Sequence, residues 1–155
     1  MNSHISVAPL DVTLKGFSML KQSKKRWFSK AFYSHYQGYR LCLCIYANGS
    51  GEGKRTHSSI YMYLMKGDFD DALKWPMRGI LNIQLLGRDE SWYDLCKIPF
   101  VDEVSDKVFG RLRFADASSI SRGWGCAKVI DHASLDANFL INDCLHLRIC
   151  RLEIV

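Results

Sequence analysis

The stretch GYRLCLCIYANGSGEGKRTHSSIYMYLMKG, residues 38–67, decides the fold. Apolar and other residues alternate strictly over residues 40–47, and residues 58–66 alternate in the same way. One face of these segments takes Leu41, Leu43, Ile45 and Ala47 with Ile60, Met62 and Leu64, and the other takes Arg40, Cys42, Cys44 and Tyr46 with Tyr61, Tyr63 and Met65. A period of two is typical of β-strands. The intervening residues 48–53 can turn sharply, because Asn and Gly tolerate positive φ. The stretch therefore predicts a β-hairpin around which the chain packs.

Further strand-like segments lie on both sides of this hairpin. They cover residues 17–20, 27–33, 80–86, 92–100, 126–130 and 144–155. Strands do not alternate here with long helical segments, which disfavours a parallel sheet. We expect an all-β fold, an eight-stranded antiparallel β-sandwich.

The remaining segments are predicted to be connections. Residues 1–12 are expected to form a loose leader and residues 13–155 a single domain. We expect one helical turn, capped by Asp68 and closed by Pro76, and another within residues 132–140. Residues 101–114 are expected to form a loop with a short strand near its end, at residues 111–114.

Composition bounds the class of protein. The chain has 155 residues, 48% hydrophobic and 24% charged, and a formal net charge of +5. No apolar run approaches the roughly 20 residues of a membrane span, and the N-terminus lacks the pattern of a secretory signal. The six cysteines form no CxxC pair. We therefore expect six free thiols in a reducing compartment and a cytoplasmic location.

Sites for catalysis or cofactors are not indicated. The glycine-rich segment fails the P-loop pattern, because Asn48 stands at the position of its first glycine and Arg55 at the position of its Ser or Thr. The five histidines have no zinc spacing, and the acidic residues 68–71 have no calcium-loop spacing. A Cys–His nucleophile pair stays open, since such partners lie far apart in sequence. We expect no enzyme, no catalytic residue, no metal and no cofactor, and no nucleic-acid partner because no such motif is present.

A family resemblance covers roughly residues 17–152. The aromatic block WFSKAFY (27–33) followed by GYRLCL (38–43) is similar to the FYxxxxGYKLCL segment of TRAF-C domains, the MATH-type domains of tumour-necrosis-factor-receptor-associated factors. YANGSGEG (46–53) and THSSIY (56–61) resemble that family's YLNGxGxGxGTHLSLF. MKG (65–67), Asp70, Leu73, WP (75–76), Gly125 and NDCL (142–145) continue the match. The resemblance implies the same eight-stranded sandwich.

The resemblance also implies a peptide-binding role. Domains of this family hold an extended peptide from a receptor tail along a sheet edge. The binding positions carried over to this chain are Tyr46, Gly51, Tyr61, Ile83, Phe100 and Gly125. The residues themselves leave a second interpretation open, in which Tyr61, Ile83 and Phe100 are core and the two glycines only form turns.

Three positions depart from the family's pattern. Cys44 aligns with a basic residue that meets acidic peptide side chains, and Ser50 aligns with an acidic loop residue. Asp106-Lys107-Val108, before Phe109, replaces a run of serines that holds a peptide glutamine. We therefore expect a different peptide from the family's usual one.

The resulting expectation is a non-enzymatic adaptor domain that binds a peptide from a receptor tail or signalling partner. The family's trimers rely on a coiled coil, which this chain lacks, so a monomer or a weak trimer is expected. The alternative is a membrane-surface module, in which Lys21, Lys24, Lys25 and Arg26 bind acidic phosphoinositide head groups.

Overall fold

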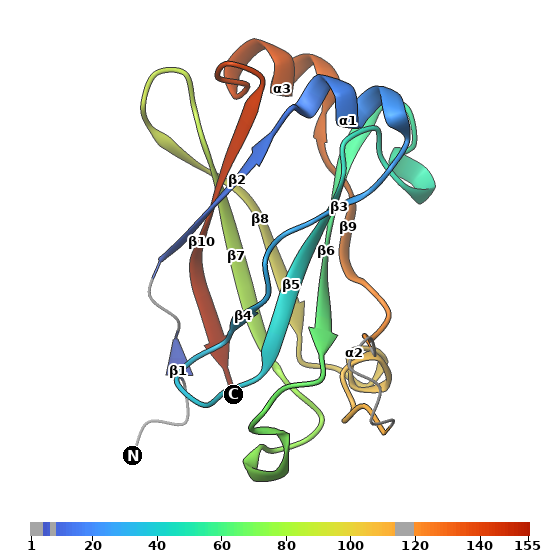
Figure 1. Cartoon of the computed structure of the whole chain (residues 1–155), viewed down its shortest axis with the longest axis vertical. Coiled ribbons are helices and arrows are strands. Elements are labelled where there is room, and N and C mark those ends of the chain that lie inside the picture. Colours follow the sequence, from blue (N-terminus) through green and yellow to red (C-terminus); the bar gives the residue numbers. More distant parts are fainter. Residues whose placement is uncertain (1–4, 7–8, 114–119) are drawn as a thin grey trace.

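A computed structural model describes residues 5–6, 9–113 and 120–155. The described chain forms two antiparallel sheets packed face to face (Figure 1). The first sheet has the order β1 (Ile5–Ser6), β10 (Cys144–Ile154), β7 (Gly79–Leu86), β8 (Trp92–Phe100), with β2 (Leu10–Lys15) also paired to β10. The second has the order β3 (Trp27–Phe28), β5 (Arg40–Tyr46), β6 (His57–Met65), β9 (Trp124–Asp131), with β4 (Phe32–Tyr33) also paired to β5.

The predicted all-β antiparallel sandwich is confirmed. β1 and β2 both pair with β10, and β3 and β4 both pair with β5, so each couple acts as one interrupted strand. Counted in this way, the described strands give the expected eight. The central hairpin is β5–β6, whose register sets Arg40 opposite Met65 and Tyr46 opposite Ser59.

The core forms between the two sheets, where the alternation predicted it. Leu41, Leu43 and Ile45 of β5 are fully buried against Leu81 and Leu147 of the first sheet. Each such side chain contributes about 1.5–3 kcal/mol by leaving water. Because the side chains of this inner face are fully buried, any binding surface on these strands has to lie on their opposite faces.

The first strand lies earlier in the chain than predicted. Ile5–Ser6 and residues 10–12 belong to the predicted leader, but both segments pair with β10, and the partners of residues 10–12 are Ile149, Arg148 and Leu147. Asp11 is fixed there by an ion pair, in which Arg148 Nε lies 2.6 Å from its Oδ1. A partner more than 130 residues away is not visible in a local pattern.

The prediction of a strand at residues 17–20 is wrong. These residues begin α1 (Phe17–Ser23), after Gly16 turns the chain with a φ of 72°. Asp143 caps the helix from the far end of the chain, accepting hydrogen bonds from the Ser18 amide at 3.0 Å and the Ser18 hydroxyl at 2.6 Å. Phe17 and Leu20 are three residues apart, a spacing that sets them on one face of a helix but on opposite faces of a strand, so it favours the helix that the structure shows.

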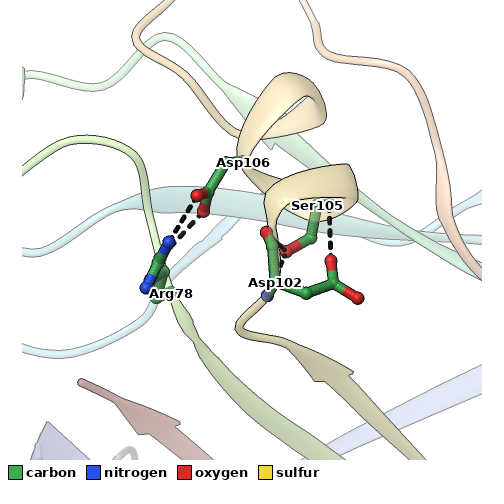
Figure 2. Close-up of polar contacts among 4 residues, drawn as sticks. All are labelled: Arg78, Asp102, Ser105 and Asp106. Carbon is green, nitrogen blue, oxygen red and sulfur yellow. Dashed lines mark hydrogen bonds and ion pairs between the residues drawn. The ribbon is translucent and has the colours of Figure 1, made fainter.

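The prediction of a loop at residues 101–114 is also wrong in part. Residues Glu103–Val108 form α2, and Arg111–Arg113 form no strand, while Phe114 lies outside the described residues. Asp102 accepts a hydrogen bond from the Ser105 amide, and the Ser105 hydroxyl lies 3.2 Å from the Asp102 amide (Figure 2). This capping box starts the helix.

The other connections agree more closely with the sequence. The predicted turn in residues 132–140 is the helix α3 (His132–Asn138). The turn near Pro76 is η2 (Asp70–Ala72), but its cap is Phe69 without a side-chain bond, so the predicted Asp68 cap is wrong. A further short turn, η1 (Gly51–Gly53), lies in the central hairpin. α1 and α3 lie at one end of the sandwich and α2 at the other (Figure 1).

Candidate functional site

The outer face of the second sheet carries a cluster separate from the main core. We call it the tyrosine face, and it consists of Cys42, Cys44, Tyr46, Tyr61, Tyr63 and Met65. The β5–β6 register sets Cys44 opposite Tyr61 and Cys42 opposite Tyr63. The rings of Tyr46 and Tyr61 meet edge to face, with centroids 5.9 Å apart and planes at 89°. Both tyrosines are half-buried, so each keeps part of its surface accessible to solvent.

Arg26 brings a cation to this face from the edge of the sheet. Phe28 of β3 pairs with Cys44, which sets Arg26 beside the end of β5. Arg26 Nη1 lies 3.5 Å from the Tyr46 hydroxyl and 3.4 Å from the Tyr63 hydroxyl. Its guanidinium also lies over the Phe28 ring, 4.8 Å from the centroid. The bond to Tyr46 raises the pKa of Arg26, and the exposed guanidinium forms no ion pair with a described residue.

Gly125 adjoins the tyrosine face on β9, opposite Tyr61. A Cβ atom at this position would lie 2.1 Å from the Ile60 carbonyl oxygen and 2.8 Å from the Tyr61 Cα. Only glycine therefore lets β9 approach β6 this closely. Within the described residues β9 pairs with β6 alone, so β9 is an edge strand of this sheet, and Trp124 Nε1 at its start donates to the Pro99 carbonyl of β8 at 2.8 Å.

A pocket of about 340 Å³ opens beside Tyr46. We call it the cationic pocket; its walls are Lys24, Lys25, Lys54, Arg55, Tyr46 and the loop residues 47–51. Gly51 belongs to this loop and has a φ of 56°. Thr56 Oγ1 lies 2.8 Å from His57 Nδ1 at the end of the loop.

The six predicted binding residues therefore divide into two groups. Tyr46, Tyr61 and Gly125 come together on the tyrosine face, and Gly51 lies in the cationic pocket next to Tyr46. Ile83 and Phe100 do not join them, because they are only 1% and 0% exposed in the core between the sheets. The Phe100 ring packs edge to face against the buried Phe109. A side chain enclosed in this way cannot line an open groove.

The sequence indicates Lys24, Lys25 and Arg26 only as parts of a membrane surface, and it does not place Arg26 or Phe28 beside the tyrosines or bring the two lysines together with Lys54 and Arg55. The alternation of residues 58–66 already predicts that Tyr63 lies on the same face of the strand as Tyr61. The place of Tyr63 on the tyrosine face therefore follows from the sequence alone. The position of Arg26 beside the tyrosine face follows only from the β3–β5 register, which depends on residues far apart in sequence.

The positions that depart from the family's pattern have clear structural roles. Burial raises the pKa of the Cys44 thiol to about 11, so this position holds a neutral group under the tyrosines. The Ser50 amide donates to the Ser59 hydroxyl at 2.9 Å. Asp106 receives Arg78 Nε at 2.8 Å, which ties α2 to the start of β7 (Figure 2). Val108 packs against the core.

Within residues 5–6, 9–113 and 120–155, no three His, Cys, Asp or Glu side chains gather closely enough to hold a metal ion. No helix in that part of the chain is both long and apolar enough to cross a membrane. All six cysteines are unpaired.

Comparison with known proteins identifies the class of domain. Residues 10–150 match the family model of the MATH domain, and the chain belongs to this family. It is 31% identical over 125 residues to TNF receptor-associated factor 5 of Mus musculus, covering 79% of this chain and 22% of that protein. It is 47% identical over 62 residues to TNF receptor-associated factor 1 of Homo sapiens, covering 40% of this chain and 15% of that protein.

The structural comparison agrees. The fold matches that of Notothenia coriiceps TRAF5 with a TM-score of 0.78 at 25% identity, covering 93% of this chain and 72% of that chain. The chain spans less than a quarter of the length of these curated relatives. MATH domains of this kind are protein-interaction adaptor domains rather than enzymes.

Proposed function

We propose that this MATH domain binds an extended peptide, from a receptor tail or a signalling partner, across the tyrosine face and along β9. The observation that carries this proposal is the pair of half-buried rings of Tyr46 and Tyr61, with Arg26 beside the Tyr46 hydroxyl and no acidic partner for it among the described residues. Aromatic residues and arginine are the side chains most enriched at the centre of protein interfaces.

The backbone supports the same mode of binding. The edge strand β9 offers N–H and C=O groups to an added strand, which is how extended peptides commonly gain affinity. Side chains of such a strand alternate, so every second one would face the rings of the tyrosine face. The exposed Gly125 leaves the peptide backbone free to approach that edge.

The membrane alternative finds less support. It needs Lys21, Lys24, Lys25 and Arg26 to face one surface. The Arg26 guanidinium instead contacts Tyr46 and Tyr63, and Lys25 lines the cationic pocket. Lys21 lines an adjoining hollow that shares Lys24 and Asn48 with the cationic pocket and also contains the acidic Asp136.

The proposed ligand is a peptide from a cytoplasmic receptor tail, so we propose that this domain is located in the cytoplasm. Six unpaired cysteines fit a reducing compartment. The domain then acts as an adaptor, and its chemistry is recognition without covalent steps.

The proposal is tested with an array of peptides from cytoplasmic receptor tails, probed with the parent chain and with Tyr46→Ala. We expect Tyr46→Ala to weaken the array's strongest binders at least tenfold, because truncating a central aromatic costs about 2 kcal/mol or more. Tyr36→Ala is the matched control, since Tyr36 is 88% exposed on a turn away from the face. Equal binding by both variants and the parent, with unchanged melting curves, would contradict the proposal.

A further inference from the structure

Four basic side chains line the cationic pocket. Lys24 and Lys25 come from the end of α1, and Lys54 and Arg55 come from the central hairpin, so two distant segments converge on one hollow. All four residues are exposed, and none forms an ion pair with a described residue. Glu52, the acid nearest in sequence, is not among the lining residues. Like charges gathered without a partner repel one another, so an anion that enters the pocket is stabilised.

The helix dipole favours a lysine at the C-terminal end of α1, whereas the turn at Arg55 gives no local reason for a basic side chain. Lys24 and Arg55 have φ angles of 61° and 72°, a region that glycine occupies without strain and other residues rarely adopt. A turn alone would therefore be better served by glycine at both positions. An arginine at a strained turn that lines the same hollow as three lysines points to a role for the charge.

Neutral donors complete the lining. Asn48 and Ser50 lie in the loop that forms one wall, and their side chains form no hydrogen bond with another described residue. A phosphate monoester carries close to two negative charges and three strong acceptor oxygens. Lysine and arginine beside hydroxyl and amide donors are the groups that bind it. A carboxylate has one charge and would leave most of these donors unused.

We propose that the cationic pocket binds a phosphoryl group on the peptide that lies across the tyrosine face. Tyr46 belongs to both the pocket and the face, so a peptide on Tyr46 and Tyr61 has its next residues at the pocket mouth. This inference rests on the proposed peptide-binding function and adds the class of peptide, one carrying a phosphorylated side chain.

Two peptide pools test the inference, each degenerate in sequence around one fixed residue, phosphothreonine in one pool and threonine in the other. We expect the parent chain to bind the phosphorylated pool about tenfold or more tightly than the other. In the double variant Lys54→Gln, Arg55→Gln this ratio should fall close to one, while binding of the threonine pool stays the same. Tyr46→Ala should weaken binding of both pools.

A matched control removes the same charge elsewhere. Lys74→Gln with Lys97→Gln changes two exposed lysines outside the pocket, and it should keep the parent's preference. An equal loss in this control would overturn the inference, because the effect would then come from net charge alone. Equal binding of the two pools by the parent would also overturn it, while leaving the peptide-binding function intact if Tyr46→Ala still weakens both.

Vesicles containing phosphatidylinositol 4,5-bisphosphate distinguish a phosphopeptide ligand of the pocket from a lipid ligand. If the parent binds these vesicles through Lys54 and Arg55 and shows no preference for the phosphorylated pool, the phosphopeptide assignment is overturned. A preference for the phosphorylated pool with no vesicle binding supports it.

Discussion

At the scale of the residue, the two faces of β5 and β6 have different chemistry. The inner face is aliphatic and closed, whereas the outer face carries thiols beneath tyrosines. Burial raises the pKa of Cys44 from 9.0 to about 11, and burial also raises the pKa of Cys42. The thiols therefore stay neutral and support the rings above them by packing rather than by charge.

This pKa predicts slow alkylation of Cys44 in the native protein. A rise of about two pKa units lowers the thiolate fraction at pH 8 about hundredfold, and only the thiolate reacts. Labelling of Cys44 should increase as the pH rises toward 11, and all six thiols should react in denaturant. Peptide mapping after timed alkylation measures this. Fast native labelling of Cys44 at pH 8, or fewer than six labels on the unfolded chain without reductant, would contradict the prediction.

A second prediction at this scale concerns Gly125. A Cβ here meets the Ile60 carbonyl oxygen at 2.1 Å, so Gly125→Ala must move β9 away from β6. We expect a loss of about 2 kcal/mol in the free energy of unfolding, as for other overpacked sites. Gly110→Ala is the control, because the nearest atom to its Cβ is the Asp106 carbonyl oxygen at 3.8 Å. Denaturant unfolding compares the two, and equal stabilities would show that β9 adapts freely.

At the scale of the element, the sequence predicts strands better than helices. Alternation over many residues identifies β5, β6, β7 and β10, because period two is a local property. α1 is missed because its cap, Asp143, comes from the far end of the chain. α2 is missed although Asp102 and Ser105 have cap spacing, because serine replaces the Glu or Gln that usually marks a capping box.

The cap of α2 predicts a measurable effect. Asp102→Ala removes the acceptor of the Ser105 amide, which lies 2.9 Å from Oδ1, and such caps contribute about 1 kcal/mol. Hydrogen exchange of the α2 amides should accelerate. Glu103→Ala is the matched control, since it removes a charge from the same turn and no hydrogen bond. Identical exchange in the two variants would mean that the tie between Arg78 and Asp106 holds the helix without its cap.

The candidate site was predictable only in part, for the same physical reasons. Tyr46 and Tyr61 follow from alternation within one hairpin. Alternation also sets Ile83 on the inner face with Leu81 and Leu85, and the structure follows this pattern rather than the role carried over from the family. Arg26 and the cationic pocket depend on segments that only the folded chain brings together.

At the scale of the whole molecule, we predict a monomer for these 155 residues at micromolar concentration. The described helices have six or seven residues each, and a coiled coil needs several heptads. Sedimentation velocity measures the mass directly. A stable trimer at low micromolar concentration would show that the sandwich itself supplies the interface.

The central claim is that the tyrosine face and the edge of β9 form one peptide-binding surface. Its most direct test is a titration of isotope-labelled protein with the strongest peptide from the array, followed by the backbone amide chemical shifts. We predict that the largest shifts surround Tyr46, Tyr61 and Gly125, while the amides of β2, β7 and β10 stay in place. Shifts concentrated on the first sheet, with those three residues unmoved, would contradict the account.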